Sequence, residues 1–259
     1  MGALEGRKLL VIGASSGTGR ATAIAFARHG AQVAFAARRA DRLAEAIAEA
    51  GSGHAVAIDV LDPASIDSGV AAAADALGGL DGILYTAGMS PVAELRETDA
   101  ADWERVFAVN TFGPNLVIRA ALPHLSTDAV VGVVSSDSSG EPRHSLVPYA
   151  SSKIALEATL QGWRTEELGG KRFLTIVLGP TLPTEFGDAF PPDRLGELFG
   201  HWQRQGFRTG LMNADDVAEQ LAVTYTTMFS FPTFGVEELL LRAPEPAQAL
   251  DNFGSETVE

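Results

Sequence analysis

The stretch LLVIGASSGTG, residues 9–19, decides the fold of this chain. Its first four residues are a short, continuous apolar run of the kind that a buried parallel strand shows. A glycine-rich turn follows at once, and residues 20–29 then have the pattern of a helix that stops at Gly30. A strand, a glycine turn and a helix in this order predict the first unit of an α/β sheet.

The same alternation continues along most of the 259 residues. It predicts an α/β fold of Rossmann-like, doubly wound type, with a seven-stranded, mostly parallel sheet and helices on both faces. We find no repeat and no linker, so we expect a single domain over residues 1–259. Further strands are expected at 33–37, 54–58, 82–86, 129–134, 173–178 and 236–241, and further helices at 40–50, 63–77, 99–125, 147–168 and 213–228.

Composition and charge exclude several classes of function. The chain has no cysteine, which excludes disulfides, thiolate metal sites and cysteine nucleophiles, and its five histidines show no metal-ligand spacing. A net charge of -14 argues against nucleic-acid binding, which favours a basic face. No long uncharged apolar stretch and no signal-peptide pattern are present. We therefore expect a cytoplasmic protein without a metal, a nucleic-acid partner or a membrane span.

The glycine turn predicts a cofactor site. Gly13, Gly17 and Gly19 have the spacing G-x-x-x-G-x-G. Such a turn between a strand and a helix brings backbone N–H groups to a pyrophosphate, and the helix N-terminus adds a favourable dipole. The alternative is that the glycines only make a tight turn. The predicted dinucleotide-binding loop also contains Ser15, Ser16 and Thr18.

The end of the second strand indicates which dinucleotide binds. Sites for NAD place an acidic residue there for the ribose 2′-hydroxyl, whereas sites for NADP place an arginine near the 2′-phosphate. This chain has Ala37 at the acidic position, followed by Arg38 and Arg39. A guanidinium suits a phosphate by charge and by geometry, so we predict NADP(H). The alternative is that both arginines are solvated charges at the start of a helix.

Two further strand ends are candidates for cofactor contacts. Asp59 follows the third predicted strand and is placed to accept a hydrogen bond from the adenine amino group, although a turn or capping role remains open. Ala87 and Gly88 follow the fourth strand, where small residues let the backbone approach a ligand closely.

Tyr149 and Lys153 lie one helical turn apart at the predicted start of a helix. A free phenol has a pKa of about 10, and a neighbouring ammonium favours the phenolate. We therefore expect Lys153 to lower the pKa of Tyr149 toward neutrality, which would suit a general acid or base. The spacing alone occurs by chance in many helices.

Over residues 5–242 the chain resembles the short-chain dehydrogenase/reductase family. Six motifs occur in the family's order, each on the expected element, and Ser136 precedes Tyr149 by the family's usual 13 residues. The motifs are Gly13-x-x-x-Gly17-x-Gly19, Asp59-Val60, Tyr85-Thr86-Ala87-Gly88, Val109-Asn110, Ser136 and Tyr149-x-x-x-Lys153.

The resemblance implies a catalytic tetrad. Ser136 would orient the substrate oxygen, and Tyr149 would exchange a proton with it while hydride moves to or from the nicotinamide. Lys153 would tune Tyr149 and hold the nicotinamide ribose, and Asn110 would hold a water that links Lys153 to solvent. Ser135, Ser138 and Ser139 are rival candidates for the serine.

The chain also departs from the family pattern. The family's N-N-A-G is Y-T-A-G here, so contacts of the asparagine side chains are lost or replaced. After the sixth strand the family's Pro-Gly order is reversed in Gly179-Pro180, while Thr184 keeps the position that the resemblance assigns to the nicotinamide carboxamide.

Residues 183–210 interrupt the alternation where the family has a substrate lid. Its apolar side chains either line a substrate pocket or pack the lid onto the body. They are Phe186, Phe190, Leu195, Leu198, Phe199, Trp202 and Phe207, with Met89, Pro91, His144 and Leu146 as the expected opposite wall.

Together these features predict an NADP-dependent oxidoreductase that interconverts a ketone and a secondary alcohol in a small to medium, fairly apolar substrate. A non-catalytic NADP-binding regulatory protein on the same fold is the alternative, and an epimerase or dehydratase of the extended relatives is a second one. The resemblance further implies a homodimer or homotetramer, with the helices at 99–125 and 147–168 in the dimer interface.

Overall fold

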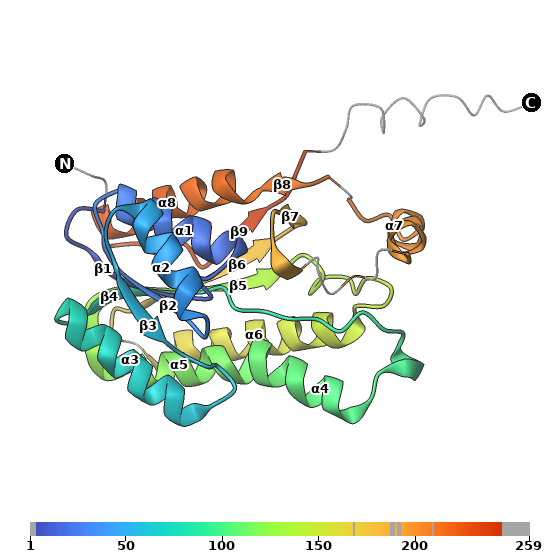
Figure 1. The fold of residues 1–259 in the computed structure, drawn as a ribbon, viewed down its shortest axis with the longest axis horizontal. Coiled ribbons are helices and arrows are strands. Elements are labelled where there is room, and N and C mark those ends of the chain that lie inside the picture. The colour runs from blue at the N-terminus through green and yellow to red at the C-terminus, as the bar shows by residue number, and fades with distance from the viewer. Residues whose placement is uncertain (1–3, 168, 187–189, 191–192, 209, 245–259) are drawn as a thin grey trace, which may run out of the picture.

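A seven-stranded parallel sheet forms the centre of the computed structural model (Figure 1). The structure describes residues 4–167, 169–186, 190, 193–208 and 210–244. The strand order is β3-β2-β1-β4-β5-β6-β9, and every neighbouring pair is parallel. This confirms the predicted doubly wound sheet. The strands are β1 (Lys8–Ile12), β2 (Gln32–Ala37), β3 (His54–Ala57), β4 (Leu80–Tyr85), β5 (Leu125–Ser136), β6 (Arg172–Leu178) and β9 (Glu238–Leu241).

Helices cover both faces of this sheet. Successive strand residues point to opposite sides, so both faces carry apolar side chains that must be buried. Leu9 and Val11 of β1 lie in one apolar layer, and Leu10 and Ile12 lie in the other. The first layer is covered by α1 (Gly17–Arg28), α2 (Ala40–Ala50) and α8 (Ala214–Ser230), and the second by α3 (Pro63–Leu77), α5 (Gly113–Ala121) and α6 (Val147–Glu166) (Figure 1).

The chain winds in opposite directions from the neighbouring strands β1 and β4, which opens a crevice at their carboxyl ends. The N-terminus of α1 lies at this crevice. Asp62 caps α3 and Asn213 caps α8 through their side chains, but the N-cap residue of α1, Ser16, makes no such hydrogen bond. The first N–H groups of α1 therefore lack a side-chain cap, as in helices that receive an anion.

The long helical region predicted at 99–125 is helical from Ala100 to His124, but the type of helix changes along its length. Pro114 has no N–H to donate to the carbonyl four residues earlier. The Tyr85 hydroxyl donates to the Val109 carbonyl at 2.8 Å, and the Gly113 N–H reaches back five residues to Ala108. A π-turn results. The segments are α4 (Ala100–Phe107), the π-helix η2 (Ala108–Phe112), α5 and the 3-10 helix η3 (Leu122–His124), after which β5 begins.

The lid region contains elements that the sequence pattern did not predict. A two-stranded parallel sheet joins β7 (Thr181–Leu182) to β8 (Met212–Asn213), and α7 (Leu195–Arg204) lies between them in sequence. Residues 187–189, 191–192 and 209 of the predicted lid lie outside the described residues. Leu198 and Trp202 of α7 pack with Phe190 and Leu146, so the lid carries a small apolar cluster of its own.

Candidate active site

A cleft of about 840 Å³ opens at the carboxyl ends of the central strands. It runs from the end of β2, past the glycine turn, to α6 and the lid. Of the predicted catalytic and cofactor-binding residues, Asn110 alone does not line it. The predicted residues on its wall are Gly13, Ser15, Ser16, Gly17, Thr18, Gly19, Arg38, Arg39, Asp59, Val60, Ala87, Gly88, Ser136, Tyr149, Lys153, Gly179 and Thr184.

The glycine turn packs tightly against the loop after β4. Gly13 has a φ of +90°, and a Cβ there would lie 2.5 Å from Thr86 Oγ1. A Cβ at Gly19 would overlap the same oxygen and the Gly13 carbonyl. Thr86 in turn donates to the Ile12 carbonyl at 2.7 Å. In the Y-T-A-G motif, Thr86 and Tyr85 thus each donate to a backbone carbonyl, that of Ile12 and that of Val109.

Tyr149 lies in the first turn of α6, and its hydroxyl is hydrogen-bonded to Ser136 at the end of β5. The rival serines have other partners: Ser135 donates to the Glu157 carboxylate, and Ser139 donates to the Ser136 carbonyl at 2.8 Å. Ser138 Oγ accepts from Arg143 at 2.5 Å. Ser136 is therefore the serine that faces the phenol.

The expected lowering of the Tyr149 pKa does not occur in this structure, and that expectation was wrong. Burial raises the pKa of Tyr149 to about 12, although the hydrogen bond from Ser136 opposes the shift. Burial also lowers the pKa of Lys153 to about 8. The Lys153 ammonium donates to the Val134 carbonyl at 2.7 Å and lies 5.7 Å from the centre of the Tyr149 ring. Desolvation is thus the largest cause of both pKa shifts.

The Asn110 side chain is fully buried in the π-turn and is committed to protein contacts. Its Oδ1 accepts from the Met89 N–H at 3.0 Å, and its Nδ2 donates to the Met89 carbonyl at 2.8 Å and to Ser152 Oγ at 3.0 Å. The amide therefore ties the loop after β4 to α6. The water-holding role expected for Asn110 stays a prediction, because its Oδ1 accepts one hydrogen bond here and can accept a second.

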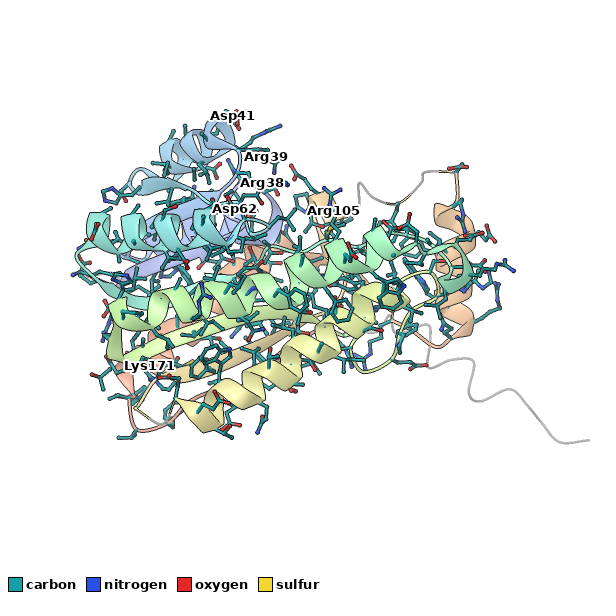
Figure 2. All side chains as sticks on the ribbon, turned by 90° about the horizontal axis from the view of Figure 1, so that it is seen from below. Arg38, Arg39, Asp41, Asp62, Arg105 and Lys171 are labelled. Carbon is teal, nitrogen blue, oxygen red and sulfur yellow. The ribbon has the colours of Figure 1, made fainter. Side chains whose placement is uncertain are left out.

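Arg39 forms a polar cluster at the end of the cleft beside β2. Its guanidinium donates to both carboxylate oxygens of Glu185 at 2.8 and 2.7 Å, and to Ser15 Oγ at 2.9 Å. Ser16 Oγ donates to Glu185 at 3.1 Å. The hydrogen bond with Arg39 holds the pKa of the Glu185 carboxyl below its ordinary value. Figure 2 shows Arg38 and Arg39 at the start of α2, and Arg105, another cleft residue, on α4.

Asp59 has a local partner as well as a place on the cleft. Its Oδ1 accepts from the Leu61 N–H at 3.0 Å, and its own N–H donates to Ser65 Oγ at 2.9 Å. These bonds form a turn, as the alternative interpretation of Asp59 predicted.

The reversed Gly179-Pro180 pair also lines the cleft. It is held to the end of β9, because the Gly179 N–H donates to the Leu241 carbonyl at 2.9 Å.

A buried ion pair beside Tyr149, formed by Arg143 and Asp137, was not predicted from the sequence. Arg143 and Asp137 side chains are 6% and 5% exposed and meet through two hydrogen bonds of 2.6 and 2.9 Å. The Arg143 guanidinium also lies 4.5 Å from the centre of the Phe207 ring in the lid. Both charged residues line the cleft. The only sequence signal was a charged pair six residues apart that flanks a serine run.

The described ranges contain neither a cluster of metal ligands nor a membrane-spanning helix. No group of three or more histidine, aspartate or glutamate side chains among these residues is arranged to hold a metal ion. No helix in the same part of the chain is long and apolar enough to cross a membrane.

Comparison with known proteins identifies the family. Residues 7–193 match the model of the family described as short chain dehydrogenase. The chain belongs to this family. Among curated relatives of this short chain dehydrogenase, a protein of Pseudocercospora fijiensis named short chain dehydrogenase is 34% identical over 210 residues, covering 77% of this chain and 67% of that protein. Glycine betaine reductase ATRR of Emericella nidulans is 33% identical over 231 residues, which are 85% of this chain but 18% of that protein.

Solved structures agree with this family membership. A short chain dehydrogenase from Burkholderia cenocepacia, described as a complex with NADP, is 25% identical to this short chain dehydrogenase with a TM-score of 0.77. The match covers 92% of this chain and 97% of that one. The chain is therefore a member of an oxidoreductase family, and it has the parallel sheet and the cleft that the sequence led us to expect.

Proposed function

We propose that this short chain dehydrogenase is an NADP-dependent oxidoreductase that interconverts a ketone and a secondary alcohol. One observation carries the proposal: the Tyr149 hydroxyl, hydrogen-bonded to Ser136, lies in the same cleft as the glycine turn and Arg39. A proton-transfer group and a dinucleotide-binding loop in one cleft are what hydride transfer to a carbonyl requires.

The residues present fit a phosphorylated dinucleotide. The N-terminus of α1 lacks a side-chain cap, and Arg39 with Ser15 and Ser16 already holds an anionic group, the Glu185 carboxylate. When bound, NADP(H) would supply or accept the hydride. Arg38, Arg39 and Ser15 would hold its adenosine end, and the glycine turn its phosphates. The NADP complex of the Burkholderia cenocepacia relative supports the choice of cofactor.

Proton transfer to the substrate depends on three side chains. Ser136 and Tyr149 present hydroxyls to a carbonyl oxygen, and Tyr149 donates the proton to that oxygen as the alcohol forms. Lys153, whose Nζ donates to the Val134 carbonyl, keeps further N–H donors for a ribose hydroxyl. Asn110 acts as a positioning residue, because it fixes the Met89 backbone and Ser152 behind them.

The pocket beyond Tyr149 favours a fairly apolar substrate. The Phe186 ring lies 4.9 Å from the Tyr149 ring, and Phe190, Phe199 and Trp202 complete the lid side of the cleft. The alternative, a non-catalytic NADP-binding regulatory protein, predicts binding without turnover. Oxidation of NADPH in the presence of a panel of ketones and quinones separates the two proposals.

The pH dependence follows from the raised pKa of Tyr149. A group with a pKa of about 12 is protonated at neutral pH, so it can act as an acid in ketone reduction without further tuning. Alcohol oxidation needs the phenolate, whose fraction rises about tenfold per pH unit below the pKa. We expect kcat/KM for oxidation to rise from about pH 7 to about pH 9 while that for reduction does not rise. An oxidation rate already constant above about pH 7 would contradict this.

We also propose a homodimer through the helices around α4 and α6. Phe112 of the π-turn and Ile154 of α6 are large apolar side chains that are 57% and 47% exposed, and a second copy packed on these helices would remove them from water. Light scattering should give twice the 27.1 kDa mass of the chain. A mass of one chain at micromolar concentration would exclude the dimer.

A further inference from the structure

The Glu185 carboxylate is held as a bound anion would be. Arg39 donates to both of its oxygens, at 2.8 and 2.7 Å, which is the two-pronged geometry that a guanidinium forms with carboxylates and phosphates. Ser16, the N-cap residue of α1, adds a third donor at 3.1 Å. The Ser15 hydroxyl accepts from the same guanidinium at 2.9 Å and completes the cluster.

This anion site lies where the adenosine end of a dinucleotide belongs. Arg39 follows the end of β2, and Ser15 and Ser16 lie in the turn between β1 and α1. In a doubly wound sheet, the ribose that carries the 2′-phosphate of NADP lies beside these two strand ends. The groups that hold Glu185 are therefore those that would receive that phosphate.

The two anions cannot share the cluster. The Arg39 guanidinium already donates to both oxygens of the Glu185 carboxylate. A phosphate beside Glu185 would also place two negative charges within a few ångströms of each other. Glu185 comes from the segment after β7, and Thr184 of that segment packs on the glycine turn, within 3.2 Å of the Cβ position of Gly17. The carboxylate thus comes from the segment after β7 that packs on the glycine turn.

We infer that Glu185 is a specificity-determining residue that competes with the 2′-phosphate of NADP(H) for Arg39, Ser15 and Ser16. NAD(H) carries a hydroxyl at this position and leaves the Arg39–Glu185 pair in place, whereas NADP(H) must displace the carboxylate. Glu185 therefore narrows the preference for NADP(H) over NAD(H). The inference rests on the proposed NADP-dependent function.

The test is the affinity of the full chain for cofactor, measured by isothermal titration. Dissociation constants are determined for NADPH, NADH and adenosine 2′-monophosphate, which carries the phosphate without the nicotinamide. Glu185→Gln keeps the shape and removes the charge. Because the ion pair is about half exposed, we expect NADPH and adenosine 2′-monophosphate to bind about fivefold more tightly to the variant. NADH should bind within about twofold of its wild-type affinity.

Asp41→Asn is the matched control, since Asp41 is an acid whose charge also acts on Arg39 but which comes from α2 (Figure 2). It should change the ratio of the two cofactor affinities by less than about twofold. If it tightens NADPH binding as much as Glu185→Gln does, the effect is one of general charge and the inference is overturned.

Two further outcomes distinguish a failure of this inference from a failure of the proposed function. A wild-type chain that prefers NADPH, with the same preference in Glu185→Gln, overturns the role of Glu185 and leaves the proposed cofactor intact. A chain that prefers NADH, and that fails to bind adenosine 2′-monophosphate both as wild type and as Glu185→Gln, overturns the proposed cofactor and the inference together.

Discussion

Tyr149→Phe is expected to lower NADPH-dependent ketone reduction by about 100- to 10,000-fold while NADPH still binds. The substitution removes the hydroxyl that is hydrogen-bonded to Ser136 and keeps the ring that contacts Phe186. No other described tyrosine lines the cleft, so the chain has no substitute phenol there. Turnover and NADPH affinity are measured on the same preparation.

Tyr225→Phe provides the control for this experiment. Tyr225 is a buried tyrosine on the opposite face of the sheet, where its hydroxyl donates to the Ile83 carbonyl at 2.6 Å. Its loss should cost stability, about 1 kcal/mol, without a comparable loss of turnover. Equal turnover in Tyr149→Phe and the wild-type protein would remove Tyr149 from the proton transfer.

Arg143→Met is expected to lower the free energy of unfolding by about 3–5 kcal/mol. The substitution leaves the Asp137 carboxylate, which is 5% exposed, without the two hydrogen bonds that Arg143 donates. Arg242 lies 3.8 Å from the same carboxylate and offers only partial compensation. Urea denaturation followed by circular dichroism measures the change.

A double variant, Asp137→Leu with Arg143→Met, shows whether the unpaired charge is the cause. Replacing a buried ion pair by apolar side chains is often neutral, so most of the lost stability should return. A double variant at least as unstable as Arg143→Met would show that packing against Phe207, and not the buried charge, explains the loss.

The alternation of strands and helices in the sequence predicted the sheet well, because each of these elements is recognised from local sequence. Each buried strand is a short apolar run, and α3 begins at Pro63 with Asp62 as its cap, as expected. The candidate site residues follow strand ends, and parallel strands bring those ends to one edge. For this reason the cleft gathers residues from Gly13 to Thr184 that motifs alone had selected.

Two features that the sequence did not predict depend on contacts between distant segments. Glu185 reaches Arg39 across 146 residues of chain, and the π-turn depends on the Tyr85 hydroxyl, 24 residues from Val109. The pKa of Tyr149 was misjudged for a similar reason. The spacing of Tyr149 and Lys153 shows their proximity, but not the burial that raises one pKa and lowers the other.

The central claim is tested most directly by following the hydride. Wild-type protein is incubated with a panel of apolar ketones and NADPH that carries deuterium at both positions of C4 of the nicotinamide, and the products are examined by mass spectrometry. The account predicts a secondary alcohol with one deuterium on its carbinol carbon, formed with one equivalent of NADP. Tight NADPH binding without any labelled alcohol across the panel would contradict it and favour the regulatory alternative.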